Sequence, residues 1–187
     1  MFDFLKPNPA VALLKEDHDR VQKLFDRFEA AKGRAAKRKI ARQALTELKV
    51  HAALEEELFY PSVRKPVGKQ VMNEADEEHH VAKLLIAELD TMDGSESHFD
   101  AKFLVLAENV RHHIREEENE MLPKAEKAKV DFEALAAKMT RRKERLLADG
   151  VPPASEDAMV RSAHGRGDSP ARSARRKAPK LPRGKKR

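Results

Sequence analysis

The chain contains no cysteine and no tryptophan, and aromatic residues make up only 5% of its 187 residues. Without cysteine it cannot form disulfide bonds, present a thiolate nucleophile or build a cysteine-ligated zinc or iron–sulfur site. It also lacks an apolar run close to the ~20 residues of a membrane-spanning helix, and its first residues are too few and too acidic for a signal peptide. These absences lead us to expect a soluble, cytoplasmic protein with no membrane contact.

Charge is abundant but unevenly distributed along the chain. Residues 161–187 contain eleven lysines and arginines and one acidic residue, whereas residues 1–160 contain 27 basic and 31 acidic residues. The basic segment also has proline, glycine and serine but almost no large apolar side chains, so burial cannot offset the entropy of ordering it. We therefore predict a mildly acidic folded domain over residues 1–150 and a disordered basic tail over residues 151–187.

Five segments of the folded part have apolar residues at helical spacing. The predicted helices cover about residues 9–33, 34–64, 70–92, 97–128 and 131–148. Glycine and proline mark the breaks between them, at Gly33, Gly68, Gly94 and Gly150. Four long helices with short connections predict an all-α protein, an antiparallel up-and-down four-helix bundle with the fifth helix packed outside it.

One arrangement of polar residues occurs twice in the chain. A histidine is followed by a His-x-x-x-Glu pair and then by a proline, and each residue type recurs 61 or 62 positions later. The first set is His18, His51, Glu55 and Pro61, and the second is His79, His113, Glu117 and Pro123. Apolar residues after His18 and His79 also share their spacing, so one segment of about sixty residues has been used twice. The core repeat spans about residues 10–128.

The two His-x-x-x-Glu pairs predict buried polar groups. Their members are one helical turn apart and share a face with leucine and valine residues, so they would point into the bundle. Burying two ionised glutamates costs several kcal/mol unless each is paired or binds a cation. Four neutral imidazoles and two carboxylates offer mixed nitrogen and oxygen donors with a net charge of −2, which suits a pair of first-row metal ions.

These residues and their register resemble the hemerythrin-like family, also called the HHE cation-binding domain. The resemblance implies a four-helix bundle with two non-haem irons, bridged by carboxylates and by an oxo or hydroxo group, and an open position for a small oxidant. It implies that His18, His51, His79 and His113 are imidazole ligands and that Glu55 and Glu117 are the bridging carboxylates. The implied function is to bind or react with O2, peroxide or NO, in sensing, storage or oxidative stress. A metal-dependent oxidase-like or peroxidase-like activity is left open.

One position departs from the oxygen-carrying hemerythrins. They have a further histidine on the third helix, where this sequence has Lys83. About eight protein donors then remain for two ions that together prefer about ten to twelve, which leaves more positions for water or substrate. Reaction with an oxidant is therefore favoured over reversible oxygen carriage. Glu56, Glu118, His80 and Lys83 remain alternatives for completing the shell, and zinc and manganese remain alternatives to iron.

The remaining polar residues are assigned less central roles. Tyr60, the only tyrosine, is predicted at the rim of the site with its hydroxyl group in water, and the alternative is a hydrogen bond near the site or a part in redox chemistry. His80 and His112 point about 100° away from the neighbouring histidines and are predicted to lie outside the metal shell or on the surface. His98 and His164 are not predicted as ligands.

A different class of function is suggested by the basic tail. Residues 161–187 have the charge to bind nucleic acid or another anionic surface, with the bundle as a scaffold or sensor. No aromatic residue interleaves these charges, so binding would be non-specific and strongly salt-dependent rather than based on stacking. The chain contains no P-loop, dinucleotide fingerprint, serine nucleophile elbow or zinc-protease motif, so an enzyme would have to act through its metals.

Overall fold

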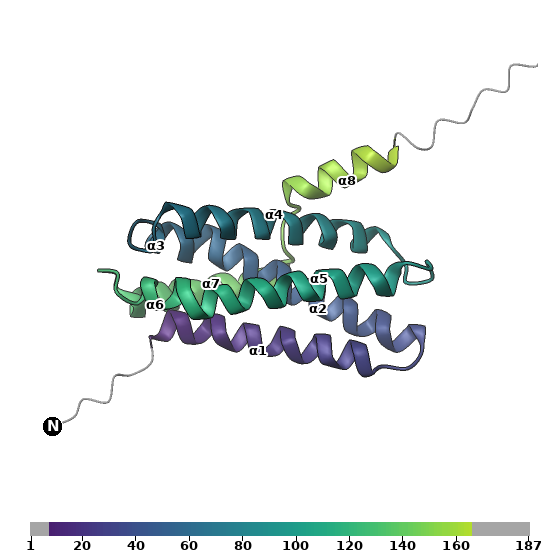
Figure 1. Ribbon diagram of the computed structural model, residues 1–187, viewed down its shortest axis with the longest axis horizontal. Helices are drawn as coiled ribbons and strands as arrows, with labels where there is room; N and C mark the ends of the chain where they lie inside the picture. Colours follow the sequence, from purple (N-terminus) through teal and green to yellow (C-terminus); the bar gives the residue numbers. More distant parts are fainter. Residues whose placement is uncertain (1–7, 166–187) are drawn as a thin grey trace, which may run out of the picture.

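The structure, a computed structural model, describes residues 8–165, and helices are the only regular secondary structure in that range. Four long helical rods lie side by side (Figure 1). They are α1 (Pro9–Ala30); α2 (Arg34–Leu54) continued by η1 (Glu55–Phe59) and α3 (Tyr60–Val67); α4 (Lys69–Thr91); and α5 (Phe99–Glu116) continued by η2 (Glu117–Met121) and α6 (Leu122–Ala125). Two more helices follow, α7 (Phe132–Asp149) and α8 (Ser155–Gly165). The predicted all-α fold class is confirmed.

Local sequence signals account for where the rods begin and end. The Asn8 side chain accepts hydrogen bonds from the backbone N–H groups of Ala10 and Val11 at 3.1 and 3.2 Å, and Pro9 occupies the first helical position. Gly68 alone separates α3 from α4, and its φ of 99° is one that side chains rarely adopt. The chain reversal between the second and third rods therefore depends on glycine at this position.

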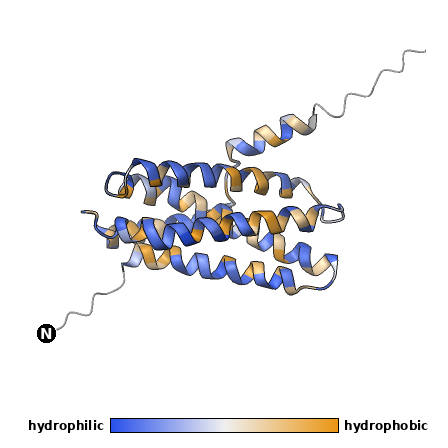
Figure 2. Ribbon diagram, in the orientation of Figure 1, coloured by the Kyte–Doolittle hydropathy of each residue, from blue (hydrophilic) through white to orange (hydrophobic). Residues whose placement is uncertain are grey.

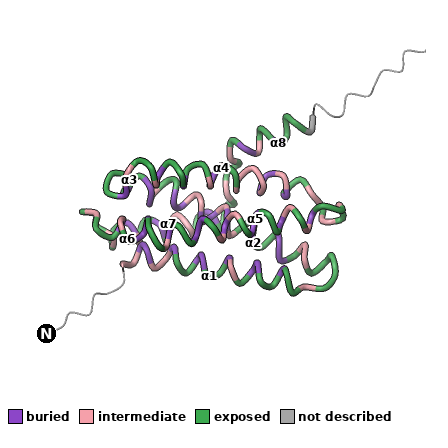
Figure 3. The backbone as a smooth tube through the Cα atoms, in the orientation of Figure 1, coloured by how far each residue is buried: buried purple, intermediate pink, exposed green. Residues whose placement is uncertain are grey.

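The apolar interior forms two clusters, one toward each end of the rods. One contains Leu14, Leu54 and Met121 together with α7, and the other contains Phe25, Phe103 and neighbouring residues. Buried positions recur along every rod, so each rod turns one face inward (Figure 3), while hydrophilic residues cover much of the remaining surface (Figure 2). The α7 helix packs against α1, α2 and η1, as the predicted outer helix should.

The boundary predicted for the tail is wrong for residues 155–165, which form α8. This helix packs on α4 (Figure 1). Asp157 caps it by accepting a hydrogen bond from the Ala154 N–H at 2.7 Å, and the carboxylate of Glu156, which is 3% exposed, contacts His80 Nδ1 at 2.7 Å. Composition alone did not reveal this cap and this contact of a buried carboxylate. Residues 166–187, where the tail is also predicted to be disordered, lie outside the described residues.

None of the helices in the described range is both long enough and apolar enough to cross a membrane.

Candidate metal centre

The structure brings all six predicted ligand residues together between the two apolar clusters. Along each rod, the histidine lies between residues of the two clusters: a residue of one cluster precedes it and a residue of the other cluster follows it. The six side chains are buried, from 0% exposed for Glu55 to 7% for His51 and His113. Their ligand-type atoms form two groups whose members lie within 4.8 Å of one another: His18, His51, Glu55 and Glu117, and then Glu55, His79 and His113.

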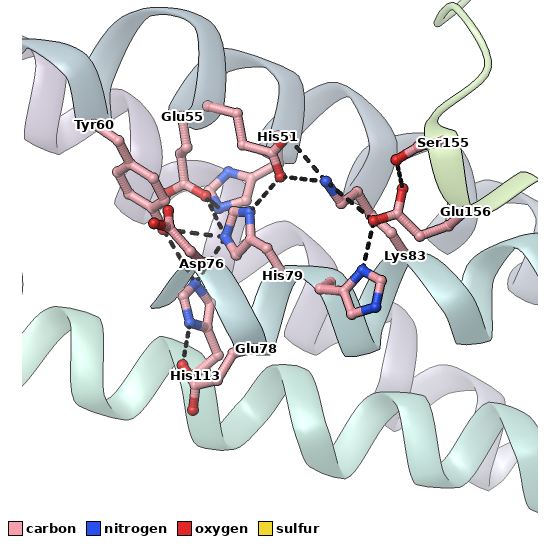
Figure 4. A network of polar contacts seen from close by, with 12 residues as sticks. His51, Glu55, Tyr60, Asp76, Glu78, His79, Lys83, His113, Ser155 and Glu156 are labelled. Atoms are coloured by element: carbon pink, nitrogen blue, oxygen red, sulfur yellow. Dashed lines mark hydrogen bonds and ion pairs between the residues drawn. The ribbon is translucent and has the colours of Figure 1, made fainter. Parts of the chain in front are cut away.

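The imidazole Nε2 atoms converge in pairs. The Nε2 atoms of His18 and His51 are 3.2 Å apart, and those of His79 and His113 are also 3.2 Å apart. Glu55 Oε2 lies between the two pairs, 3.2 Å from His51 Nε2 and 3.3 Å from His79 Nε2 (Figure 4). Glu117 Oε2 lies 3.1 Å from His18 Nε2. Glu55 is therefore placed to serve both halves of the site.

The carboxylate oxygens and imidazole nitrogens of the site are arranged to bind cations and do not form good hydrogen bonds with one another. The four carboxylate oxygens of Glu55 and Glu117 are fully buried, and none has a hydrogen bond of acceptable geometry, although Oε2 of each is 3.1–3.3 Å from imidazole nitrogens. Buried ionised carboxylates without partners cost several kcal/mol. Two shared cations would satisfy the oxygens and the converging nitrogens at once, so this set of residues is suited to hold a pair of metal ions.

Without a cation, protons must satisfy the cluster. Burial opposes the charged form of His51, but the carboxylates of Glu55 and Asp17 outweigh burial and raise the pKa of His51 to about 10. The same balance, with Glu55 and Glu56 as the carboxylates, raises the pKa of His79 to about 9. Although burial acts against it, His51 and His79 hold the pKa of Glu55 well below its usual range. Bound metal would replace the imidazole protons.

Each of the four histidines turns its other ring nitrogen, Nδ1, toward a carboxylate. His18 Nδ1 is 2.8 Å from Glu118, His79 Nδ1 is 2.9 Å from Glu56, and His113 Nδ1 is 2.7 Å from Glu78. These contacts fix the ring orientation and leave Nε2 free to face the centre of the site. The alternative of Glu56 as a metal ligand is thus not supported, because its carboxylate lies on the far side of the His79 ring.

The contact of the fourth histidine, His51, with a carboxylate is longer, and that carboxylate also forms an ion pair with a lysine. Asp17 Oδ2 is 3.8 Å from His51 Nδ1, and Asp17 is also ion-paired with Lys143 of α7. Sequence reasoning missed Asp17 and Glu78 as members of the site. The 61-residue offset between them, the same as between His18 and His79, was the signal that could have identified them.

The predicted rim position of Tyr60 is wrong. Its side chain is 1% exposed, and its hydroxyl oxygen lies 3.1 Å from His79 Nε2 and 3.5 Å from His113 Nε2. The cause is the π-helical turn η1, in which the Tyr60 N–H bonds to the Glu55 carbonyl five residues earlier. A π turn places Tyr60 above Glu55 on the inner face, whereas an α-helix would rotate it about 140° away.

Proline explains why the wide turn occurs at the same place in both halves. Pro61 and Pro123 each directly follow the residue that closes a π-helical segment, at Glu55–Phe59 and Glu117–Met121. Proline has no N–H to donate to the carbonyl four residues earlier, and its ring clashes with that carbonyl. The duplicated proline therefore favours a π turn at each buried glutamate, a feature often found at functional sites.

The remaining candidates lie outside the ligand set. His80 contacts Glu156 of α8, and Lys83 Nζ is 3.0 Å from Glu56 Oε1, so neither approaches the converging nitrogens. His112, with a side chain 53% exposed, faces Glu116, and His98 is exposed. His164 belongs to α8, but its side chain is not among the described parts of the structure.

A small cavity of about 40 Å³ lies against the four histidines. Its other walls are mainly apolar, with Val21, Leu48 and Val110 among them. One ordered water needs about 10–15 Å³ of such space, so the cavity has room for a molecule of two or three heavy atoms. The site can thus hold a small ligand beside the metal positions.

Comparison with known proteins agrees with this geometry. Residues 10–125 match the family described as Hemerythrin HHE cation binding domain. The chain is 28% identical over 107 residues to a DNA nickase of Nostoc sp., covering 57% of this chain and 30% of that protein. It is 27% identical over 123 residues to an uncharacterized hemerythrin-like protein of Schizosaccharomyces pombe, covering 64% of this chain and 61% of that one. The chain thus spans less than two thirds of either relative.

A solved structure shares the fold. The crystal structure of a Hemerythrin HHE cation binding domain-containing protein from Mycobacterium kansasii superposes with a TM-score of 0.60 at 22% identity, covering 74% of this chain and 92% of that one. At this identity the likeness concerns the fold alone. The family match, in contrast, covers more than half of the chain and includes all six converging residues. The chain therefore belongs to the hemerythrin HHE cation-binding family.

Proposed function

We propose that the bundle holds two non-haem iron ions and that this pair binds or reacts with O2, hydrogen peroxide or NO. The observation that carries the proposal is the pair of convergent His/Glu groups joined by Glu55, whose carboxylate oxygens are buried without hydrogen-bonding partners. Bound iron would supply one-electron redox chemistry and open positions for a diatomic ligand or peroxide. Zinc and manganese suit similar donors, and family membership favours iron over them.

The residues divide the work between two metal positions. His18, His51 and Glu117 would hold one ion, His79 and His113 the other, and Glu55 would bridge them. The Tyr60 hydroxyl, 3.1 Å from His79 Nε2, faces the second position and is a further oxygen donor there. Lys83 stands where the oxygen carriers have histidine, and its Nζ is paired with Glu56 instead of lying among the converging nitrogens. This leaves coordination positions for a reactant and supports oxidant chemistry over reversible oxygen carriage.

The surrounding residues keep the centre oriented and dry. Carboxylates on the Nδ1 side, such as Glu78 on His113 at 2.7 Å, hold a proton there and make Nε2 the lone-pair donor. Burial and the nearby carboxylates, Glu117 first among them, raise the pKa of Tyr60 well above its usual value, so the phenol keeps its proton unless a cation displaces it. The cavity of about 40 Å³ beside the histidines has mainly apolar walls, so it has room for a small ligand and little water.

Metal analysis with spectroscopy tests the proposal. Protein produced with iron should contain about two irons per chain. The visible spectrum of the reduced protein should change when air or peroxide is added. A protein that takes up zinc or manganese in preference to iron, or whose reduced iron shows no spectral response to O2, peroxide or NO, would contradict the proposal.

A second candidate function is non-specific nucleic-acid binding through residues 161–187. Two observations favour it: the eleven basic residues of that segment, and the similarity to a protein named DNA nickase. The aligned part is 107 residues, 30% of that protein, so its activity is only a hypothesis for this chain. Replacing the basic residues of 172–187 by glutamine should abolish binding to duplex DNA at low salt while metal content stays unchanged. Unchanged DNA affinity would exclude this role for the tail.

A further inference from the structure

Two neighbouring pockets lie on the side of the metal centre where α2 faces α4. The inner one is the cavity of about 40 Å³ that touches the four histidines. The outer one, of about 340 Å³, lies beneath residues 151–154, the segment that leads from α7 to α8. The outer pocket has room for several waters, whereas the inner one holds only a molecule of two or three heavy atoms.

Three side chains line both pockets and therefore form the wall between them: Ala52, Lys83 and Ile86. Ala52 contributes only a methyl group to this wall. The Lys83 side chain is 24% exposed, whereas Ile86 is 4% exposed and packed. The wall is thus thin at Ala52 and is completed by a long, flexible side chain rather than by close-packed apolar groups.

The internal repeat supplies a reference for this wall. On the opposite side, where α1 faces α5, the counterparts of Ala52 and Ile86 are Ile114 and Phe25. Ile114 is 4% exposed and Phe25 is 0% exposed, so two large apolar side chains close that side by packing. The counterpart of Lys83 there is Gln22. The two sides of the centre therefore differ in how a small molecule can cross them.

Lys83 is held in the wall by two carboxylates from different elements. Its Nζ lies 3.0 Å from Glu56 Oε1 and 3.7 Å from Glu156 Oε1 of α8 (Figure 4). Glu156 is 3% exposed and also contacts His80 Nδ1, so α8 is anchored at this point. The position of the Lys83 ammonium group therefore depends on the docking of α8 onto α4.

We propose that the outer pocket is the access route to the metal centre, that the passage runs beside Ala52, and that Lys83, held by Glu56 and more loosely by Glu156, is its gate. The passenger is a neutral molecule of two heavy atoms, such as hydrogen peroxide or dioxygen. Lys83 and Glu56 offer a donor and an acceptor to peroxide at the mouth, and the apolar cavity walls beyond accept either molecule. The identity of the passenger rests on the proposed function, but the route itself does not.

Because the chain has no cysteine, one introduced thiol is a unique reporter of access. Val21→Cys places it deep in the inner cavity, at a residue that is 3% exposed. The rate at which methyl iodide, an uncharged molecule of two heavy atoms, methylates this thiol with loss of iodide is measured by mass spectrometry in the full-length, metal-containing protein. In this background Ala52→Leu should slow labelling about tenfold, since an isobutyl group in place of a methyl group fills the thin part of the wall. Lys83→Ala should speed labelling about threefold, as expected for removal of a gate.

The repeat provides the matched controls. Gln22→Ala and Ile114→Leu alter the corresponding positions of the opposite wall and should leave the labelling rate unchanged. Circular dichroism shows whether each variant is folded, and metal analysis shows whether it contains metal. If Val21→Cys is not folded or does not bind metal, Val110→Cys serves as the reporter. Equal effects of the two walls, or no effect of Ala52→Leu, would overturn the proposed route.

A second measurement separates this proposal from the proposed function. In iron-loaded protein without an added cysteine, Ala52→Leu should slow the spectral response to peroxide about tenfold at unchanged iron content, and Ile114→Leu should not. If the unmodified protein shows no response to oxidants, the proposed function fails, while thiol labelling still decides the route. If the unmodified protein responds and Ala52→Leu responds equally fast, the route is wrong and the function stands.

Discussion

The half of the centre built on α1 and α2 differs from the half built on α4 and α5 in a few side chains that contact the metal centre or line the pockets beside it. The polar parts are duplicated: each half has two histidines, one buried glutamate, one π turn and two carboxylates behind the histidines. Positions that differ between the halves include Tyr60 against Leu122, Ala52 against Ile114, and Gln22 against Lys83. Duplication thus supplies the metal-binding shell, and the few unmatched residues make the centre one-sided, with a phenol at one position and a thin wall beside it.

The buried glutamates give the strongest test of how equal the halves are. Glu55 approaches histidines of both halves at 3.2 and 3.3 Å, whereas Glu117 groups with His18 and His51. We expect Glu55→Ala to lose both metals and Glu117→Ala to lose mainly one, measured as metal per chain after dialysis. Exposed His98 supplies the control, because His98→Ala should retain both metals. Equal losses in the two glutamate variants would mean that both carboxylates bridge.

The carboxylates behind the histidines should matter next. Glu78 contacts His113 Nδ1 at 2.7 Å, whereas Asp17 is 3.8 Å from His51 Nδ1 and is also paired with Lys143. Loss of such a partner typically weakens metal binding about 10–100-fold. Glu78→Gln should therefore lower metal affinity by about that factor, and Asp17→Asn should do so less, in competition titrations with a chelator. A larger effect of Asp17→Asn would show that the longer contact tightens when metal binds.

Protonation offers a measurement on the metal-free protein that also separates the halves. The folded-state pKa values of His51, about 10, and His79, about 9, lie above the 6.5 of an unfolded chain. Their contribution to the free energy of unfolding is therefore complete below pH 6.5 and is lost as pH rises through 9 and then 10. Thermal unfolding of the metal-free protein should show its melting temperature falling across this window.

The metal-bound protein should behave in the opposite way. Metal requires neutral imidazoles, so its apparent affinity should increase across the same pH window in which the metal-free protein loses stability. Resolved imidazole signals in NMR spectra should show His79 losing its proton before His51. A metal-free protein equally stable at pH 6 and pH 10 would contradict the assignment of raised pKa values to these histidines.

The sequence alone predicts much of this arrangement, for reasons that are physical. Helical periodicity turns His51 and Glu55 inward together, and the second copy of the pattern predicts that Glu117 joins them. The helix breaks at Gly68 and Gly150 are equally local features. Each of these predictions depends on spacing within a single regular helix, which is the property that sequence expresses most directly.

The features that sequence reasoning missed depend on something other than regular spacing. Tyr60 was predicted at the rim because an α-helical phase was assumed, and the π turn before Pro61 changes that phase. Helix α8 forms where composition suggested a tail, because Glu156 is satisfied by His80, a residue 76 positions away. Long-range pairing and irregular helix geometry cannot be read from local periodicity.

Tyr60 also provides the finest comparison of the two halves, and the smallest expected effect. Tyr60→Phe removes one buried hydroxyl from beside His79 and His113, while Leu122→Met changes the counterpart at nearly constant volume. Once a metal occupies His79 Nε2, the hydroxyl can act only on the metal or on a molecule bound to it, and a contact of this kind is worth about 1 kcal/mol, so the second metal should bind about fivefold more weakly in Tyr60→Phe. The first metal should be unaffected, and Leu122→Met should match the unmodified protein in both affinities.

The visible spectrum distinguishes the two ways in which Tyr60 can act. Burial and the carboxylates keep its pKa well above the usual value, so only a directly bound cation would remove its proton. An absorption band of the iron-loaded protein that disappears in Tyr60→Phe and persists in Leu122→Met would identify the phenolate as a ligand of the second iron. An unchanged spectrum with weaker binding of the second iron would limit Tyr60 to a hydrogen bond, and the halves would then differ in their surroundings but not in their ligands.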